Sequence, residues 1–197
     1  MAYRRSLNVS GGFWVVVCMM ILIVPWKWLA AFFTAVFVHE CAHIIAVKAC
    51  GGKIVSMKIG TSGIIMEITE LSLFWEWICA MAGPAGSMIL LPLARWMPRT
   101  AICAAVHLLY NLLPIYPLDG GRALRCLAEI LFSPTTADKI CRAAETSVLL
   151  TVGILSFMGS FLWKLGFAPL LLGTLVFYRA VKNSLQTRER AGTIVLP

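Results

Sequence analysis

Long apolar stretches alternate with short polar turns along most of the chain. The apolar stretches lie at residues 12–24, 28–50, 72–93, 101–113 and 147–178. A helix that crosses the hydrocarbon core of a bilayer needs about 20 mostly apolar residues, so the last stretch is too long for one span. We expect it to divide at Lys164-Leu165-Gly166. The pattern therefore predicts six membrane-spanning helices.

Two segments between the second and third apolar stretches have a different pattern. Residues 53–59 and 63–69 carry β-favouring side chains and flank the turn Gly60-Thr61-Ser62, which is typical of a β-hairpin. The expected fold class is therefore an all-α polytopic membrane protein, with about six transmembrane helices and a small β-hairpin between the second and the third.

Irregular segments interrupt or follow two of the apolar stretches. Gly83-Pro84-Ala85-Gly86 falls inside the third stretch, where it predicts either a broken helix facing protein or a water-filled cavity, or a packing kink between helices. Pro114-Ile115-Tyr116-Pro117 follows the fourth stretch. After it, residues 121–131 have the pattern of a short amphipathic helix, and Ser133-Pro134 can begin the next one.

Composition and charge support a membrane location. Of the 197 residues, 60% are hydrophobic and 13% are charged, whereas about 25% are charged in soluble domains. With the N-terminus in the cytoplasm, six spans place thirteen Lys and Arg residues on the cytoplasmic side and four outside, as expected for loops that are positive inside. These loops account for the net charge of +8, so no nucleic-acid partner is expected. We expect one membrane-embedded domain over residues 1–197, with both termini in the cytoplasm.

The chemistry of the chain centres on the second apolar stretch, which contains His39-Glu40-Cys41-Ala42-His43. Two histidines four residues apart lie on one face of a helix and can bind a single Zn²⁺. Glu40 follows the first histidine and can act on water without being a ligand. This H-E-x-x-H spacing is typical of zinc hydrolases, and ionisable side chains inside an apolar span are costly unless they have a function.

A catalytic zinc site needs a third protein ligand and an open position. The candidates are Asp119, which follows the double-proline segment, and His107, which lies on the same helical face as Asn111. A carboxylate would offset the charge of the metal in a low-dielectric setting. Asp119 can instead cap the helix that starts near Gly120. We favour Asp119 as the ligand and His107 as a packing or supporting residue.

Together, H-E-C-A-H and the later Asn111-Leu112-Leu113-Pro114-Ile115-Tyr116-Pro117-Leu118-Asp119-Gly120-Gly121-Arg122 resemble the site-2 protease family of intramembrane zinc metalloproteases (peptidase M50). Within that family they are most similar to the sporulation factor IV FB type. The resemblance covers most of residues 28–122. No appended CBS or PDZ domain is expected.

The resemblance assigns roles to individual residues. It implies that His39, His43 and Asp119 are the ligands of one zinc ion per chain and that Glu40 is the catalytic acid/base. It implies that Asn111 contacts substrate, and it matches Gly83-Pro84 with a Gly-Pro break of the family. This chain has Ser87 where many members have Asn, which weakens the expectation of a role for the Gly83-Pro84 stretch in the site.

The expected function is intramembrane proteolysis of a membrane-associated protein. The resemblance points to a pro-sigma factor processed during sporulation, with a membrane-anchored anti-sigma factor as the alternative substrate. It also implies a bacterial cell membrane, such as the outer forespore membrane, together with inhibitory membrane partners. A homo-oligomer is left open. Two other functions use the same ligands, namely a zinc transporter and a catalytically silent membrane scaffold. The 53–69 hairpin either presents substrate or is a structural ribbon.

Overall fold

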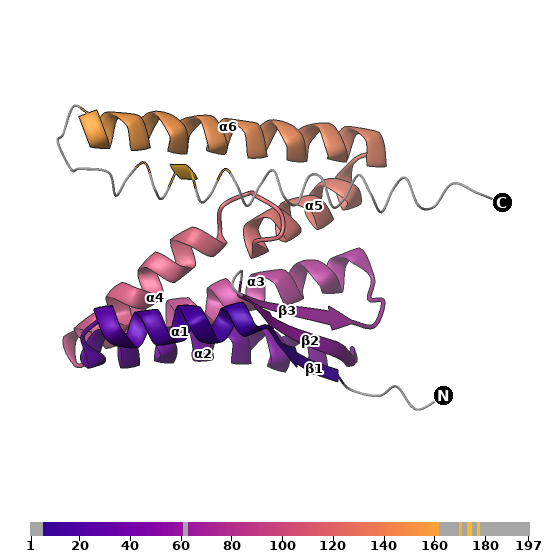
Figure 1. The fold of residues 1–197 in the computed structure, drawn as a ribbon. Coiled ribbons are helices and arrows are strands. Elements are labelled where there is room, and N and C mark those ends of the chain that lie inside the picture. The colour runs from indigo at the N-terminus through magenta and orange to yellow at the C-terminus, as the bar shows by residue number, and fades with distance from the viewer. Residues whose placement is uncertain (1–5, 61–62, 162–169, 171–172, 175–176, 178–197) are drawn as a thin grey trace. The chain divides into compact units, whose positions relative to one another are not determined.

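The computed structural model describes residues 6–60, 63–161, 170, 173–174 and 177. The described chain is mostly helical, as the sequence predicts, and carries one small sheet (Figure 1). It divides into two compact units, residues 1–112 and residues 113–197. The prediction of a single membrane-embedded domain is not tested by this division.

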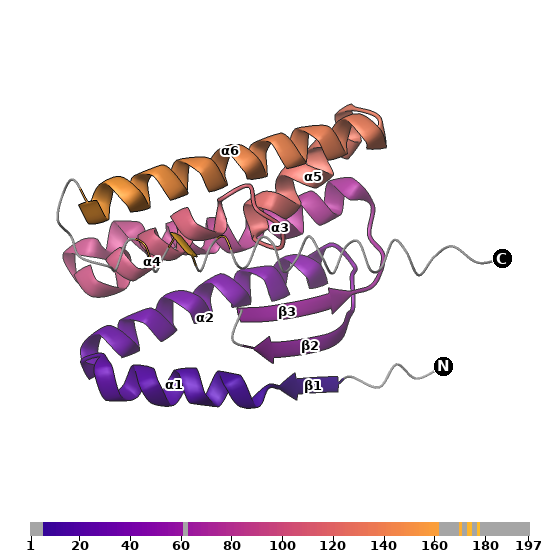
Figure 2. The same ribbon diagram turned by 45° about the horizontal axis from the view of Figure 1, so that its top comes forward.

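Within its described residues, the first unit contains three strands, four α-helices and a short 3-10 helix. In chain order these are β1 (Ser6–Val9), α1 (Gly11–Ile23), α2 (Trp26–Ala49), β2 (Ile54–Gly60), β3 (Gly63–Ile68), α3 (Leu73–Ile89), η1 (Leu91–Arg95) and α4 (Pro98–Asn111). A sharp turn at Val24-Pro25 joins α1 to α2, and α2 runs back from this turn at an angle to α1 (Figure 2).

One stripe of α2 carries its buried side chains. The buried residues recur every fourth position, at Ala31, Ala35, His39, His43 and Val47. Residues four apart lie above one another on a helix face, so the two histidines continue the stripe that the alanines begin. This face packs against α3 and α4, and the core that it enters is built around Ala35, Leu90 and Ala104. Small side chains let the three helix backbones approach closely, as is typical of helices packed within membranes.

Helix α3 is continuous from Leu73 to Ile89 with Pro84 inside it. The broken helix that the sequence allows at 83–86 is therefore not found. Pro84 is almost fully buried, and packing against α2 offsets the hydrogen bond that a proline removes from the helix ladder.

The sheet joins the N-terminal strand to the two strands that follow α2. Its order is β1-β2-β3. β2 and β3 are antiparallel, with Met57 opposite Met66, and β1 pairs in parallel with β2, with Leu7 opposite Met57. The sequence does not predict β1, because four residues with a partner some 50 positions away have no local signature. The turn of the predicted hairpin lies at residues 61–62, outside the described residues, so the hairpin itself stays a prediction.

The second unit begins with the double-proline segment and contains α5 (Asp119–Leu131) and α6 (Pro134–Phe161). Its first turn is tight, because a Cβ on Gly121 would lie 2.6 Å from the carbonyl oxygen of Ile115. The guanidinium of Arg125 pairs with Glu129 on its own helix (2.8 Å) and bridges to α6 through Asp138 (3.2 Å). α6 starts thirteen residues before the predicted fifth span, since a helix can continue through polar residues that an apolar pattern leaves out. The division predicted at 164–166 lies outside the described residues.

Three helical stretches of the described chain are long and apolar enough to cross a membrane, namely Trp26–Ala49, Leu73–Arg95 and Pro134–Phe161. α1 is shorter but apolar, and none of its residues is buried. These features agree with a membrane protein. The count of six spans stays a prediction.

Candidate metal centre

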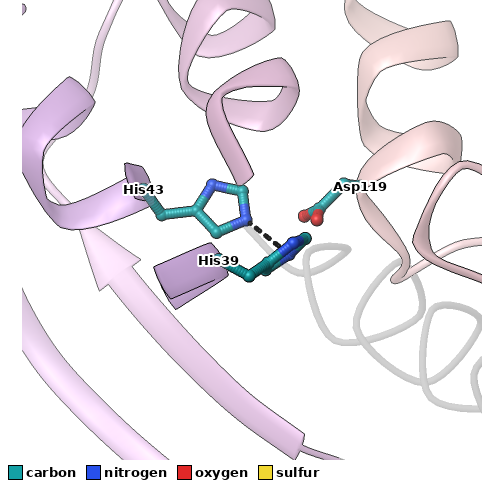
Figure 3. A group of neighbouring side chains, drawn as sticks. All are labelled: His39, His43 and Asp119. Carbon is teal, nitrogen blue, oxygen red and sulfur yellow. Dashed lines mark hydrogen bonds between the residues drawn. The ribbon is translucent and has the colours of Figure 1, made fainter. Parts of the chain in front are cut away.

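The two histidines of the H-E-x-x-H motif lie side by side on the buried face of α2. His39 is 2% and His43 is 7% exposed, and their ring centroids are 4.9 Å apart. The Nε2 atoms of the two rings are 3.2 Å apart (Figure 3). Two ligands of one tetrahedral zinc ion, each about 2.0–2.1 Å from the metal, lie about 3.3 Å apart. The imidazoles therefore already have the spacing that one zinc ion requires.

Helix α3 holds the other nitrogen of each ring. His39 Nδ1 is 2.9 Å from the hydroxyl oxygen of Ser87, and His43 Nδ1 donates to the backbone carbonyl of Cys79 at 2.7 Å. A carbonyl oxygen has two lone pairs, so Cys79 can accept this bond in addition to its place in the helix. Metal-binding histidines almost always have such a partner on the second nitrogen, because it fixes the orientation of the ring.

Gly83 leaves the space between the two imidazoles and α3 clear. A Cβ at this position would collide with Nε2 of His43 and lie 2.6 Å from Nε2 of His39. Cys79, Gly83 and Ser87 are four residues apart and therefore share one face of α3. Any side chain at 83 would fill the place where both Nε2 atoms converge, so this position requires glycine.

A carboxylate completes the group of potential ligands. His39, His43 and Asp119 each offer one ligand atom, all three residues are buried, and the three atoms lie within 4.8 Å of one another. Figure 3 draws these three side chains. Two imidazoles and one carboxylate are a donor set typical of catalytic zinc, so the residues present fit this metal.

The structure bears on two alternatives to Asp119 as the third ligand: His107 could be the ligand instead, or Asp119 could be the N-cap of α5. Among the described residues, His107 does not belong to the group; instead its ring packs edge-to-face on His39 with centroids 4.5 Å apart. The N-cap of α5 is Leu118, with no side-chain cap hydrogen bond, and Asp119 is already in the first turn. The grouping of Asp119 with the two histidines agrees with the prediction that it is the third ligand. The roles of Asp119 and His107 stay predictions.

The remaining predicted residues have clear positions. Glu40 follows His39 on α2 and is half-buried. Asn111 ends α4, where its side-chain amide donates to the backbone carbonyl of His107 at 3.0 Å. Pro84 is buried inside α3, next to Gly83. Their roles toward a substrate stay predictions.

The structure places Gly83 and Ser87 against the histidines of the motif, which the sequence pattern does not predict. Ser87 departs from the family's Asn, which weakens the expectation of a role in the site, yet its side chain is fully buried and contacts His39. The available signal was the i, i+4, i+8 spacing of Cys79, Gly83 and Ser87, all small residues on one helix face.

The fold is similar to that of a solved structure, the site-2 protease from Methanocaldococcus jannaschii. The TM-score is 0.63, the sequence identity is 21%, and the match covers 92% of this chain and 91% of that chain. No protein-family model and no curated protein matches the sequence. At this identity the likeness shows the fold alone. It agrees with the site-2 protease resemblance of the motifs and does not address the sporulation type.

Proposed function

We propose that this chain is an intramembrane zinc metalloprotease of the site-2 type. The observation that carries the proposal is the facing pair of imidazoles, with Nε2 atoms 3.2 Å apart and both Nδ1 atoms already occupied by α3. The group that His39 and His43 form with Asp119 supports it. The fold of a site-2 protease supports it independently.

His39, His43 and Asp119 would hold the zinc ion. When bound there, the metal would supply Lewis-acid chemistry, polarising a peptide carbonyl and activating water near neutral pH. The burial of all three ligands excludes bulk solvent, which strengthens electrostatic interactions inside the site. Ser87 and the Cys79 carbonyl keep the imidazoles oriented, and Gly83 keeps the space between them clear.

Glu40 is the proposed catalytic acid and base. It lies one residue beyond His39 on α2, at the edge of the buried stripe, where a carboxylate can reach water without binding the metal. Its carboxylate would take a proton from the attacking water and deliver it to the leaving amine of the cleaved peptide. Consecutive residues of an α-helix are rotated by about 100° around its axis, so Glu40 points in a different direction from the ligand His39.

The substrate would have to be extended at the cleaved bond, because a helix hides its peptide groups in its own hydrogen bonds. We propose that β3, an outer strand of the sheet, pairs with such a segment by strand addition. Asn111 is the proposed contact to the substrate backbone. Gly83 and Pro84, on α3 next to the histidine ligands, are further candidates for such a contact. The substrate class, a pro-sigma factor of sporulation or an anti-sigma factor, rests on the sequence resemblance.

The test compares wild-type protein with Glu40→Gln, each purified in detergent and incubated with a membrane-anchored candidate substrate, with and without a chelator. We expect about one zinc per chain in both proteins, and cleavage by the wild type alone, which the chelator abolishes. Cleavage by Glu40→Gln at the wild-type rate would exclude Glu40 from the chemistry. If the wild type binds zinc but cleaves neither candidate substrate, the pro-sigma factor or the anti-sigma factor, the result would favour the transporter or the scaffold.

A further inference from the structure

The two imidazoles of the candidate site are held by partners of different chemistry. His43 Nδ1 faces the backbone carbonyl of Cys79, which can only accept a hydrogen bond. His43 therefore carries its proton on Nδ1, and its Nε2 presents a lone pair. A change of side chain at position 79 leaves that carbonyl in place.

His39 Nδ1 faces a hydroxyl group, which can donate or accept. Two tautomers of His39 are compatible with this contact. In one, Nε2–H of His39 donates to the lone pair on His43 Nε2, 3.2 Å away, and the Ser87 hydroxyl donates to Nδ1. In the other, Nε2 presents a lone pair to a cation and Nδ1–H donates to Ser87 Oγ. A carbonyl at the same place would satisfy the second tautomer alone.

We propose that Ser87 is the positioning residue for His39: by accepting a hydrogen bond from Nδ1–H, it holds the ring in the tautomer whose Nε2 presents a lone pair to the metal. This inference rests on the proposed zinc function and extends it to a residue outside the H-E-x-x-H motif. Ser87 is 0% exposed and His39 is 2% exposed, so no water competes for the bond, and a buried polar contact of this kind is costly to break.

The ring of His107 also contacts His39, but this contact does not fix the tautomer of His39. Its edge-to-face contact, with centroids 4.5 Å apart and planes at 83°, restricts the tilt of the imidazole. An aromatic contact does not select which nitrogen carries the proton. The two influences are therefore separable by substitution.

The experiment measures zinc affinity by competition with a chromogenic chelator, together with the absorption spectrum of the Co²⁺-loaded protein. Loss of a partner of this kind typically weakens metal binding about 10- to 100-fold, and we expect this range for Ser87→Ala, with an altered Co²⁺ spectrum. Thr100→Val is the matched control, because it deletes another buried hydroxyl of the same unit away from the histidines. We expect wild-type affinity and spectrum for this control.

A second pair guards against a folding defect. Ser87→Thr and Ser87→Val add nearly the same volume and differ in the hydroxyl, so the threonine variant should bind zinc more tightly than the valine variant by a similar factor. Equal affinities within this pair, or wild-type affinity in Ser87→Ala, would overturn the role of Ser87 and leave the zinc site standing. Absence of zinc binding in the wild type would instead overturn the proposed function.

Discussion

At the scale of single residues, Gly83 shows how closely the site is built around one position. A Cβ there would collide with His43 Nε2, so Gly83→Ala should push the imidazoles out of register. We expect metal affinity to fall at least about as much as on loss of a supporting hydrogen bond, 10- to 100-fold. Zinc content after dialysis measures this. Gly153→Ala on α6 is the control, because a Cβ there meets nothing within 4 Å and should leave zinc bound.

The third ligand can be assigned by a pair of substitutions. Asp119→Asn keeps the shape of the side chain and removes the charge that offsets the metal, so we expect zinc affinity to fall by more than the roughly 100-fold upper limit for a supporting residue. His107→Ala should lose less than tenfold, because it removes a ring contact and no ligand. Both affinities are measured by chelator competition. The reverse order would exchange the two roles.

Residue-level chemistry was predictable from the sequence where the spacing alone carried it. The helical repeat predicts that His39 and His43 lie together. The charge argument and the irregular segment before Asp119 favoured this residue over His107, and the three residues do form one group of potential ligands. The roles of Ser87 and the Cys79 carbonyl were not predictable, because a backbone acceptor has no sequence signature and because serine fits a buried helix contact as readily as a site. Which of these two roles a serine has depends on the face of α3 that is turned toward α2, and the sequence does not give this face.

At the scale of elements, the apolar pattern located the helices but not their limits. α2 and α3 lie where the pattern predicts them, since long apolar runs with small residues favour packed helices. The continuity of α3 through Pro84 depended on packing against α2, which the sequence does not display. The sequence does not predict β1, because its partner strand is distant in sequence. α6 begins earlier than predicted because the helix also includes residues 134–146, which are too polar to belong to an apolar stretch.

The contact between α2 and α3 gives a prediction at this scale. A Cβ on Gly86 would lie 2.6 Å from Cβ of Ala42, so Gly86→Ala should force the helices apart and destabilise the protein by about 1–3 kcal/mol, as overpacking usually does. Thermal unfolding in detergent measures the change. Ala85→Leu, which adds bulk at the neighbouring exposed position, is the control. An equal melting temperature for Gly86→Ala and wild type would contradict the close packing.

At the scale of the whole molecule, the first unit sorts its connections to two ends of the helices. The turn between α1 and α2 and the start of α4 meet at one end, where the guanidinium of Arg99 lies 5.9 Å from the ring of Trp28. β1, which precedes α1, pairs with β2, which follows α2, so the sheet lies at the other end. The two turns predicted to face outward therefore lie together, as do the two segments predicted to face the cytoplasm.

This sorting makes the orientation testable. Tryptophans and basic side chains are enriched at membrane interfaces, and Trp26, Trp28 and Trp96 are exposed near the first end. We expect alkaline phosphatase to be active when fused after Met97 and inactive when fused after Leu71, whereas green fluorescent protein should fluoresce only at the second site. His39 lies thirteen residues from the start of α2 and ten from its end, about 20 Å and 15 Å along the helix, so this orientation sets the metal centre nearer the cytoplasmic face. A substrate segment would then reach the ligands from the side that carries the sheet. Phosphatase activity at both fusion sites would contradict the arrangement, because a single candidate span, Leu73–Arg95, lies between them and one span places its two ends on opposite sides of the membrane.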